Sequence, residues 1–211
     1  MYGALRKWFI PKPPAEVQAT YIALVAAARN PFFYTELAVP DTLDGRFDLI
    51  VLHLFLLQHR LIGEVSDLAV RSPAGEPERS ERGGAVTGAE RPPREALRSF
   101  AQFLSEAFFI DMDHSLRELS VADTGVSHRI KKMGKAYHGR LQAYAAALGD
   151  PTHLRAAIAR NLYGTVENGD VVVLDRMALF IENSVTALAA TDTATVTSGQ
   201  YGWPDVPTLM K

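Results

Sequence analysis

The chain contains no cysteine, so it has no disulfide bonds, no thiolate metal ligands and no thiol nucleophile. This composition suits a reducing compartment. The sequence also lacks an apolar run long enough to cross a bilayer, which takes about 20 residues. Its most apolar stretch runs from Leu49 to Leu57 and is interrupted by His53, a pattern typical of a helix buried on several sides. We therefore expect a soluble protein, which leaves peripheral membrane contact open.

Signatures of targeting, of nucleic-acid binding and of catalysis are missing as well. The N-terminal sequence MYGALRKWFIPKPP has no sustained apolar segment and does not predict a secretory signal. A net charge of -2 excludes a globally basic nucleic-acid binder, and we expect no DNA partner. The chain has no HExxH, no GxSxG, no P-loop and no GxGxxG that opens a helix. These absences predict a protein that is not an enzyme and that has no cofactor or metal site.

The spacing of apolar residues predicts an all-α fold. A chain of 211 residues fits one domain. Apolar residues recur at helical spacing in segments that make up a single-domain bundle of about six helices, at about 15–29, 46–61, 94–119, 126–148, 152–163 and 171–188. Asp44 is the candidate cap of the second helix. The last segment opens with Val-Val-Val-Leu, which is β-prone, so a strand there is the alternative.

Composition divides the chain into a helical domain and its flanking segments. Residues 1–14 contain three prolines and are expected to form an N-terminal tail, followed by the helical domain at 15–190. Within that domain, residues 72–93 have almost no large apolar side chain, which predicts a flexible loop. Residues 191–211 lack helical periodicity and contain two prolines, so we expect an extended C-terminal tail.

The clearest functional signal lies in the segment from Val126 to Leu148. Its apolar residues form one stripe at helical spacing, and no carboxylate occurs between Asp123 and Asp150. Such a face attracts the phosphates of ribosomal RNA or anionic lipid, or an acidic partner, although an ordinary solvated face fits the pattern equally well. The basic residues opposite or beside the apolar stripe are Arg129, Lys131, Lys132, Lys135, His138 and Arg140.

A second cluster contains Asp111, Asp113 and His114. Two carboxylates and a histidine so close together suggest a metal site or acid–base chemistry. However, Asp111 and Asp113 are two positions apart and point in different directions on a helix. Asp111 shares a side with the apolar residues of its helix, and a buried carboxylate needs a cation. We therefore favour a structural ion pair between Asp111 and Arg129 over catalysis.

The consecutive aromatic residues Phe32, Phe33 and Tyr34 could seat a hydrophobic ligand, although such clusters are mostly part of a core. His53 and His59 are six positions apart, which suits neither of the helical chelating spacings. We expect His53 to be a hydrogen-bonded core histidine.

Several sequence blocks together carry a resemblance to a known family. They are RNPFFY (29–34), VPDT (39–42), DGRF (44–47), LH (52–53), RL (60–61), DMD (111–113), LRE (116–118), GV (125–126), KKM (131–133), YHGR (137–140) and RNLY (160–163). In combination, these blocks resemble the ubiquinol–cytochrome c chaperone family. The resemblance covers the chain from about Ala28 to Tyr163.

This resemblance implies a helical fold and a non-enzymatic role in assembling the cytochrome bc1 complex. Mitochondrial members of the family bind newly made cytochrome b and the ribosome, and they act with a small partner protein. The chain lacks their long N-terminal targeting region, so it looks like the bacterial branch. We therefore expect a cytoplasmic protein, compatible with a peripheral place at the inner face of the plasma membrane.

A chaperone for a hydrophobic client needs an apolar groove between helices and a rim that holds the assembly near its anionic surroundings. We assign the groove to Phe32, Phe33 and Tyr34, and the rim to the basic residues of the segment from Val126 to Leu148. Two alternatives are kept. One is an enzyme that acts on a lipid or quinone-like substrate through Asp111 and a histidine; the other is an adaptor for an anionic membrane surface.

Overall fold

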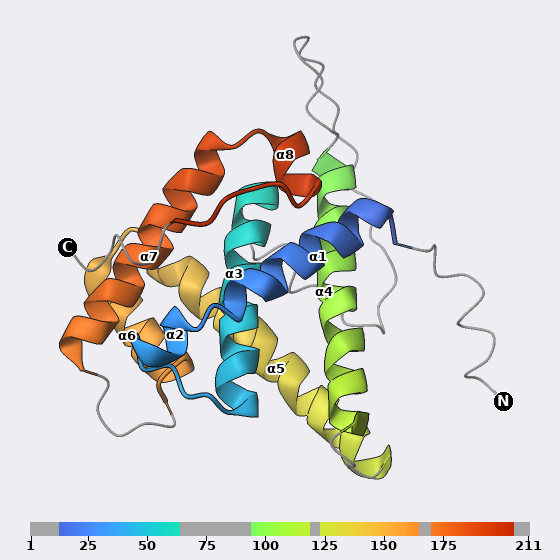
Figure 1. Ribbon diagram of the computed structural model, residues 1–211, viewed down its shortest axis with the longest axis horizontal. Coiled ribbons are helices and arrows are strands. Elements are labelled where there is room, and N and C mark those ends of the chain that lie inside the picture. Colours follow the sequence, from blue (N-terminus) through green and yellow to red (C-terminus); the bar gives the residue numbers. More distant parts are fainter. Residues whose placement is uncertain (1–12, 64–93, 119–122, 165–169, 205–211) are drawn as a thin grey trace, which may run out of the picture.

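The computed structural model describes residues 13–63, 94–118, 123–164 and 170–204, and it confirms the all-α prediction for these ranges (Figure 1). They contain helices and no strand. The six long helices all match segments predicted from periodicity, whereas the short helices α2 and α8 were not predicted. The helices are α1 (Ala15–Ala28), α2 (Phe32–Thr35), α3 (Leu43–Ile62), α4 (Arg94–Glu118), α5 (Asp123–Ala147), α6 (Pro151–Asn161), α7 (Val171–Ala190) and α8 (Thr193–Thr197).

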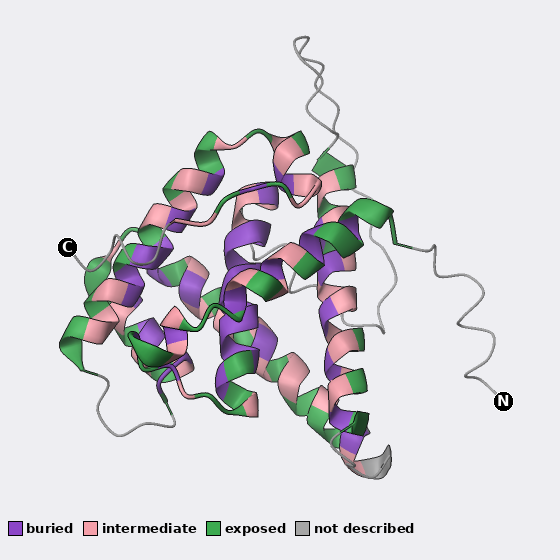
Figure 2. Cartoon of the chain, viewed as in Figure 1, coloured by how far each residue is buried: buried purple, intermediate pink, exposed green. Residues whose placement is uncertain are grey.

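Helix α3 is the centre of the bundle. It packs against α1, α4, α5 and α7, and every residue from Leu49 to Leu57 is buried. Figure 2 shows this burial along most of the helix. The prediction of a helix buried on several sides is therefore confirmed, and α3 contributes more buried apolar side chains to the core than any other described helix.

The start of α3 differs from the prediction. The cap is Thr42 and not Asp44: the Thr42 Oγ1 accepts a hydrogen bond from the backbone N–H of Gly45 at 3.1 Å. The helix therefore begins earlier than periodicity indicated, because its first turn carries few apolar residues. Gly45 also lies so close to the backbone carbonyl of Pro40 that any side chain at this position would collide with it.

Two other long helices begin at an aspartate cap. Gly149 has a φ of 85° and ends α5, and the Asp150 carboxylate accepts hydrogen bonds from the backbone N–H groups of Thr152 and His153 at the start of α6. Asp170 caps α7 in the same way. The Val-Val-Val-Leu run is therefore helical, and the alternative of a strand is wrong.

The prediction of an extended tail is wrong for residues 191–204, which fold back onto the bundle. They include helix α8, in which Val196 is fully buried, and Tyr201 is buried beyond it. The Thr20 hydroxyl of α1 donates to the carbonyl of Thr197 at 2.9 Å, and the Arg60 guanidinium of α3 donates to the carbonyls of Leu188 and Thr191, both at 2.6 Å. Contacts with distant helices fix this segment, so helical periodicity could not reveal it.

The remaining segment predictions lie outside the described residues. These are most of the N-terminal tail (residues 1–12), the loop at 72–93 and the end of the chain from residue 205. Helix α1 begins at Ala15, where the helical domain was expected to begin. None of the described helices combines the length and the apolar character that crossing a membrane requires.

Candidate functional site

Helix α5 separates apolar from basic side chains, as its sequence predicted. The helix packs against α3, α4 and α6. The predicted stripe faces these neighbours: four of its members are 1% exposed or less, and the other three are partly buried against the core. The buried four are Val126, Tyr137, Leu141 and Tyr144, and the partly buried three are Ile130, Met133 and Leu148.

Four of the predicted basic residues lie on the exposed side of α5: Arg129, Lys131, Lys132 and Lys135. We call them the α5 cationic surface. Within the part of the chain that the structure describes, none of the four forms an ion pair, so their charges are not neutralised by described carboxylates. A cluster of uncompensated cations raises the local concentration of anionic partners. The arrangement can therefore bind phosphate groups or an acidic surface.

Arg140 does not belong to this surface, contrary to the prediction. Its side chain is only 22% exposed, and its Nε lies 2.8 Å from Oδ1 of Asp48 on α3. The Nε–H of Arg140 points to the carbonyl of Asn161 at 3.3 Å, so the contact with Asp48 is an ion pair without an aligned hydrogen bond. The guanidinium also lies over the ring of Phe47. Arg140 therefore joins α3, α5 and the end of α6.

Asp48 is the partner that sequence analysis missed. Its side chain is 9% exposed. Burial raises the pKa of Asp48 to about 7, and the Arg140 guanidinium opposes that rise. The sequence did contain one indication that Asp48 needs a partner: it directly precedes the most apolar segment of the chain, where an unpaired charge is costly. Because breaking a buried ion pair leaves an uncompensated charge, this pair specifies how α5 sits against α3.

His138 also departs from the prediction of a basic face. Its side chain is half-buried, and its ring packs edge-on against Tyr137 at 5.2 Å between ring centroids. Burial lowers the pKa of His138, which favours the neutral imidazole. His138 thus contributes no lasting positive charge to the α5 cationic surface.

The predicted ion pair between Asp111 and Arg129 does not form. Instead, the Tyr21 hydroxyl donates a hydrogen bond to Oδ2 of Asp111 at 2.9 Å. Helix α1 lies across α4, so α1 and not α5 covers the side of α4 that carries Asp111 (Figure 1). Burial, followed by the nearby Asp111 carboxylate, raises the pKa of Tyr21 and keeps its hydroxyl protonated. Asp111 is therefore partnered, as predicted, but by a neutral donor.

The chemistry suggested by Asp113 and His114 also finds no support in the geometry. Asp113 forms a surface ion pair with Arg117 one turn later, at 2.8 Å. Among the described residues, no group of three or more histidines and carboxylates is arranged to hold a metal ion.

The residues Phe32, Phe33 and Tyr34 do not form the predicted open groove. Phe33 is 1% exposed, and its ring packs edge-on against Phe180 of α7. Phe32 and Tyr34 are half-buried, and the Tyr34 hydroxyl donates to the carbonyl of Ala28 at 3.2 Å. The three side chains have different environments, because α2 is a single helical turn that directs successive residues to different sides.

A cleft that was not predicted lies where α1 ends, α3 begins and α4 ends. We call it the α3–α4 cleft; its volume is about 240 Å³. Apolar side chains alternate with charged ones around it, so it offers an apolar contact area with a polar rim. Its lining comes from three separate parts of the sequence, and for this reason no local pattern revealed it. The lining residues are Arg29, Leu43, Arg46, Phe47, Ile50, Met112, Ser115 and Glu118.

Comparisons with known proteins agree on one family. The model of the family described as "Ubiquinol-cytochrome C chaperone" matches residues 35–203. The match begins after the RNPFFY block and extends through α7 and α8, beyond the last block that carried the resemblance. A crystal structure of the Cbp3 homolog from Brucella abortus is similar, with a TM-score of 0.68 and 32% sequence identity over 92% of this chain and 91% of that chain. A search of the curated proteins finds no match.

Proposed function

The chain belongs to the ubiquinol–cytochrome c chaperone family, and we propose that it serves assembly of the cytochrome bc1 complex by holding newly made cytochrome b. Membership in this family makes the protein a non-enzymatic assembly factor for ubiquinol–cytochrome c reductase. The match over residues 35–203 is the observation that carries the proposal, because it includes α3, α4 and α5, which build the α5 cationic surface and all of the α3–α4 cleft except Arg29. The choice of cytochrome b as client is our inference.

We assign the contact with the client to the α3–α4 cleft. A newly made membrane protein exposes apolar segments, which favour an apolar contact area that excludes water. Half-buried Leu43 supplies part of that area, and Phe47, Ile50 and Met112, each at most 5% exposed, supply the rest. Arg46 is already paired with Asp41 at 2.7 Å, which leaves Arg29 as the cation at the rim for a carboxylate or a carbonyl group of the client.

The α5 cationic surface has a different role in this proposal: it holds the protein close to the place where the client is made. Ribosomal RNA and anionic lipid both present phosphate groups, and both attract exposed lysine and arginine side chains. Such attraction weakens as salt is added, because exposed charges are screened. The two anionic surfaces can be told apart by measuring sedimentation of the purified protein with ribosomes and, separately, with vesicles that contain anionic lipid.

Reversing the three lysine charges tests this role of α5. We expect the Lys131→Glu, Lys132→Glu, Lys135→Glu variant to lose binding to one of these surfaces while keeping the helical content and stability of the parent. The three side chains are exposed, so the substitutions disturb no packing. If the variant binds ribosomes and anionic vesicles as well as the parent does, the assigned role of α5 is wrong. Salt-sensitive vesicle binding without any capture of cytochrome b would instead support a membrane-surface adaptor.

The client site is tested by filling the α3–α4 cleft. Ser115 lies half-buried at the cleft, so Ser115→Trp should block it, whereas His114→Trp places the same side chain on the exposed side of α4 and serves as the matched control. In a strain that lacks the native gene, we expect the Ser115→Trp variant to restore less cytochrome bc1 complex and to co-purify with less cytochrome b than the His114→Trp variant. Normal amounts of the complex in the deletion strain itself would contradict the proposed function.

A further inference from the structure

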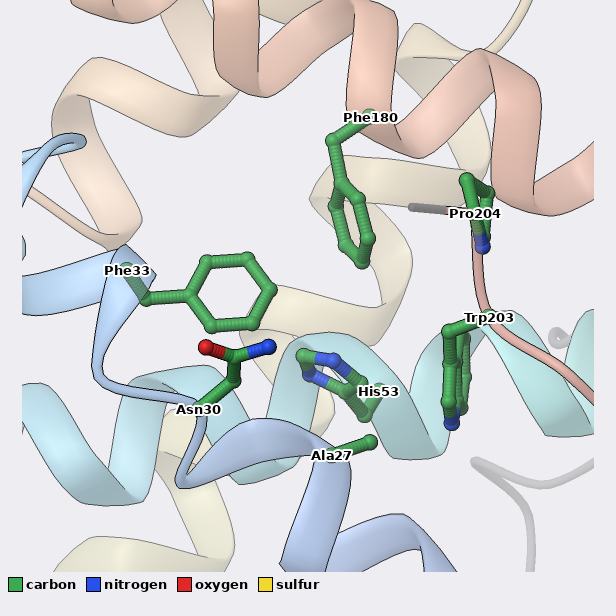
Figure 3. A pocket seen from close by; sticks show the side chains of 7 residues that line it. All are labelled: Ala27, Asn30, Phe33, His53, Phe180, Trp203 and Pro204. Carbon is green, nitrogen blue, oxygen red and sulfur yellow. The ribbon is translucent and has the colours of Figure 1, made fainter. Parts of the chain in front are cut away.

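A second pocket, unrelated to the surfaces assigned above, lies between the end of α1, helix α2, the middle of α3, helix α7 and the C-terminal segment (Figure 3). We call it the His53 pocket; its volume is about 300 Å³. An apolar cavity of about 150 Å³ is large enough to hold a benzene molecule. The pocket reaches solvent beside Asn30, an exposed residue. The volume is enough for a ligand that contains one aromatic ring; Phe33, His53 and Phe180 are at most 1% exposed, so these side chains must shift when a ligand packs against them.

Aromatic side chains form most of the wall. The ring centroids of Phe33, Phe180 and Trp203 lie 5.4, 5.6 and 4.6 Å from that of His53, and the Phe33 and Trp203 rings are edge-on to the imidazole. Aromatic walls bind flat rings well, through edge-to-face and offset-stacked contacts. These residues come from four separate segments of the chain, so the wall is a product of the tertiary fold.

His53 is the polar group in this wall. Its side chain is fully buried, and its Nδ1 lies 2.8 Å from the carbonyl oxygen of Leu49. A carbonyl oxygen only accepts hydrogen bonds, so Nδ1 carries the proton and Nε2 presents a lone pair. The sequence prediction of a hydrogen-bonded core histidine is thus confirmed for Nδ1.

Nε2 of His53 is buried and has no hydrogen-bond partner within the described residues. Figure 3 shows the nitrogen-bearing side of the ring facing the part of the pocket between Asn30 and Phe33. Burial lowers the pKa of His53 to about 4, so the ring is neutral near pH 7 and Nε2 acts as an acceptor. A buried acceptor without a partner is costly, which favours any ligand that brings a donor to it.

We propose that the His53 pocket binds a phenol, whose ring packs among Phe33, Phe180 and Trp203 and whose hydroxyl donates to Nε2 of His53. A phenol combines the two properties that the pocket selects: a flat apolar ring and a single donor at its edge. The group can come from a free phenolic compound or from the tyrosine side chain of a partner polypeptide. The proposal is independent of the client site and of the α5 cationic surface.

The test compares 4-methylphenol with toluene, which has the same ring and methyl group but no hydroxyl. The chain has two tryptophans, so in the full-length Trp8→Phe variant only Trp203 contributes tryptophan fluorescence. We expect 4-methylphenol to change this fluorescence and to bind about tenfold more tightly than toluene, because only the phenol satisfies the buried acceptor. The ¹⁵N resonance of His53 Nε2 should move as the phenol is added and stay in place with toluene.

Two histidine variants test whether Nε2 of His53 causes the preference for 4-methylphenol over toluene. His53→Phe keeps a ring but removes the acceptor, so the preference for the phenol should disappear; His59→Phe, on the same helix, should retain it. If His53→Phe does not fold, the NMR titration of the parent protein still decides the question. Equal binding of the two probes, absence of binding by both, or a stationary Nε2 resonance would each overturn the proposal.

A third probe distinguishes the two sources of the phenol. N-acetyltyrosinamide carries a tyrosine side chain between two amide groups. If it binds at least as tightly as 4-methylphenol, the pocket takes the side chain of a polypeptide. If only 4-methylphenol binds, the pocket takes a free compound. Either result supports the phenol site.

Discussion

Replacing His53 with phenylalanine should make the fold more resistant to acid, relative to the parent chain, as the pH falls. The parent keeps His53 neutral because the side chain is fully buried, and burial is the main cause of its low pKa. Among the described residues, no charged side chain contributes to the shift of this pKa, and only the hydrogen bond to Leu49 opposes it. The substitution therefore removes a single, well-isolated titrating group.

The size of the effect follows from the two pKa values. Burial lowers the pKa of His53 from 6.5 to about 4, and each pKa unit corresponds to about 1.36 kcal/mol. Above pH 6.5 the group is neutral in both the folded and the unfolded chain, so it adds no pH dependence. Below pH 6.5 the unfolded chain binds a proton that the folded chain does not, and the parent loses stability until about pH 4. The loss amounts to about 3 kcal/mol.

Asp48 acts in the opposite direction over nearly the same pH range. Its pKa is raised to about 7, so the folded chain binds a proton more readily than the unfolded chain, and stability falls as the pH rises toward 7. The pH profile of the parent alone therefore cannot isolate His53. The difference between parent and His53→Phe variant can, because both retain Asp48.

The assay is chemical unfolding of both proteins at pH 7 and pH 4.5. We subtract the free energy of unfolding of the parent from that of His53→Phe at each pH. This difference should be about 2 kcal/mol larger at pH 4.5 than at pH 7. The His59→Phe variant is the control; His59 is only half-buried, and the change there should be smaller. A difference between parent and His53→Phe that is the same at both pH values would refute the neutral, buried state of His53.

Three further substitutions test other parts of the structure. Arg140→Met should lower the free energy of unfolding by about 2–4 kcal/mol, measured by urea titration, because it leaves Asp48 buried without its cation. Tyr137→Phe should cost about 1 kcal/mol in the same assay, because the Tyr137 hydroxyl lies 2.9 Å from Nε2 of Gln58 in the core; an unchanged unfolding midpoint would contradict this network. Asp111→Asn keeps an acceptor for the Tyr21 hydroxyl, so this variant should restore normal amounts of bc1 complex in a deletion strain. Loss of function without loss of stability would instead support the alternative that the protein is an enzyme.

The long helices could be predicted because their signals are local. The apolar stripe of α5 repeats within one segment, and Asp150 caps the residues that directly follow it. The burial of α3 could also be predicted from the sequence, because the run from Leu49 to Leu57 has no polar side that could face solvent. These features depend on residues that are neighbours in the sequence.

Most of the failed predictions depend on residues that are distant in the sequence; the cap of α3 is a local exception. A helical wheel places Arg140 at the border of the apolar stripe of α5, and only the position of Asp48 on α3 decides that it points inward. Asp111 was correctly expected to need a partner, but the crossing of α1 over α4 made that partner Tyr21. The C-terminal segment could not be predicted from periodicity because it is held by other helices: α8 packs against α1, the Tyr201 hydroxyl donates to the carbonyl of Thr20 on α1, and Arg60 of α3 donates to the carbonyl of Thr191.

The most direct test of the proposed function follows newly made cytochrome b itself. Cells of the native host are pulse-labelled, the tagged full-length protein is isolated, and labelled cytochrome b is measured for the parent, Ser115→Trp and His114→Trp proteins. We predict that labelled cytochrome b accompanies the parent and His114→Trp, disappears during a chase as the complex assembles, and is strongly reduced with Ser115→Trp. Absence of labelled cytochrome b from the parent protein throughout the pulse and chase would contradict the account.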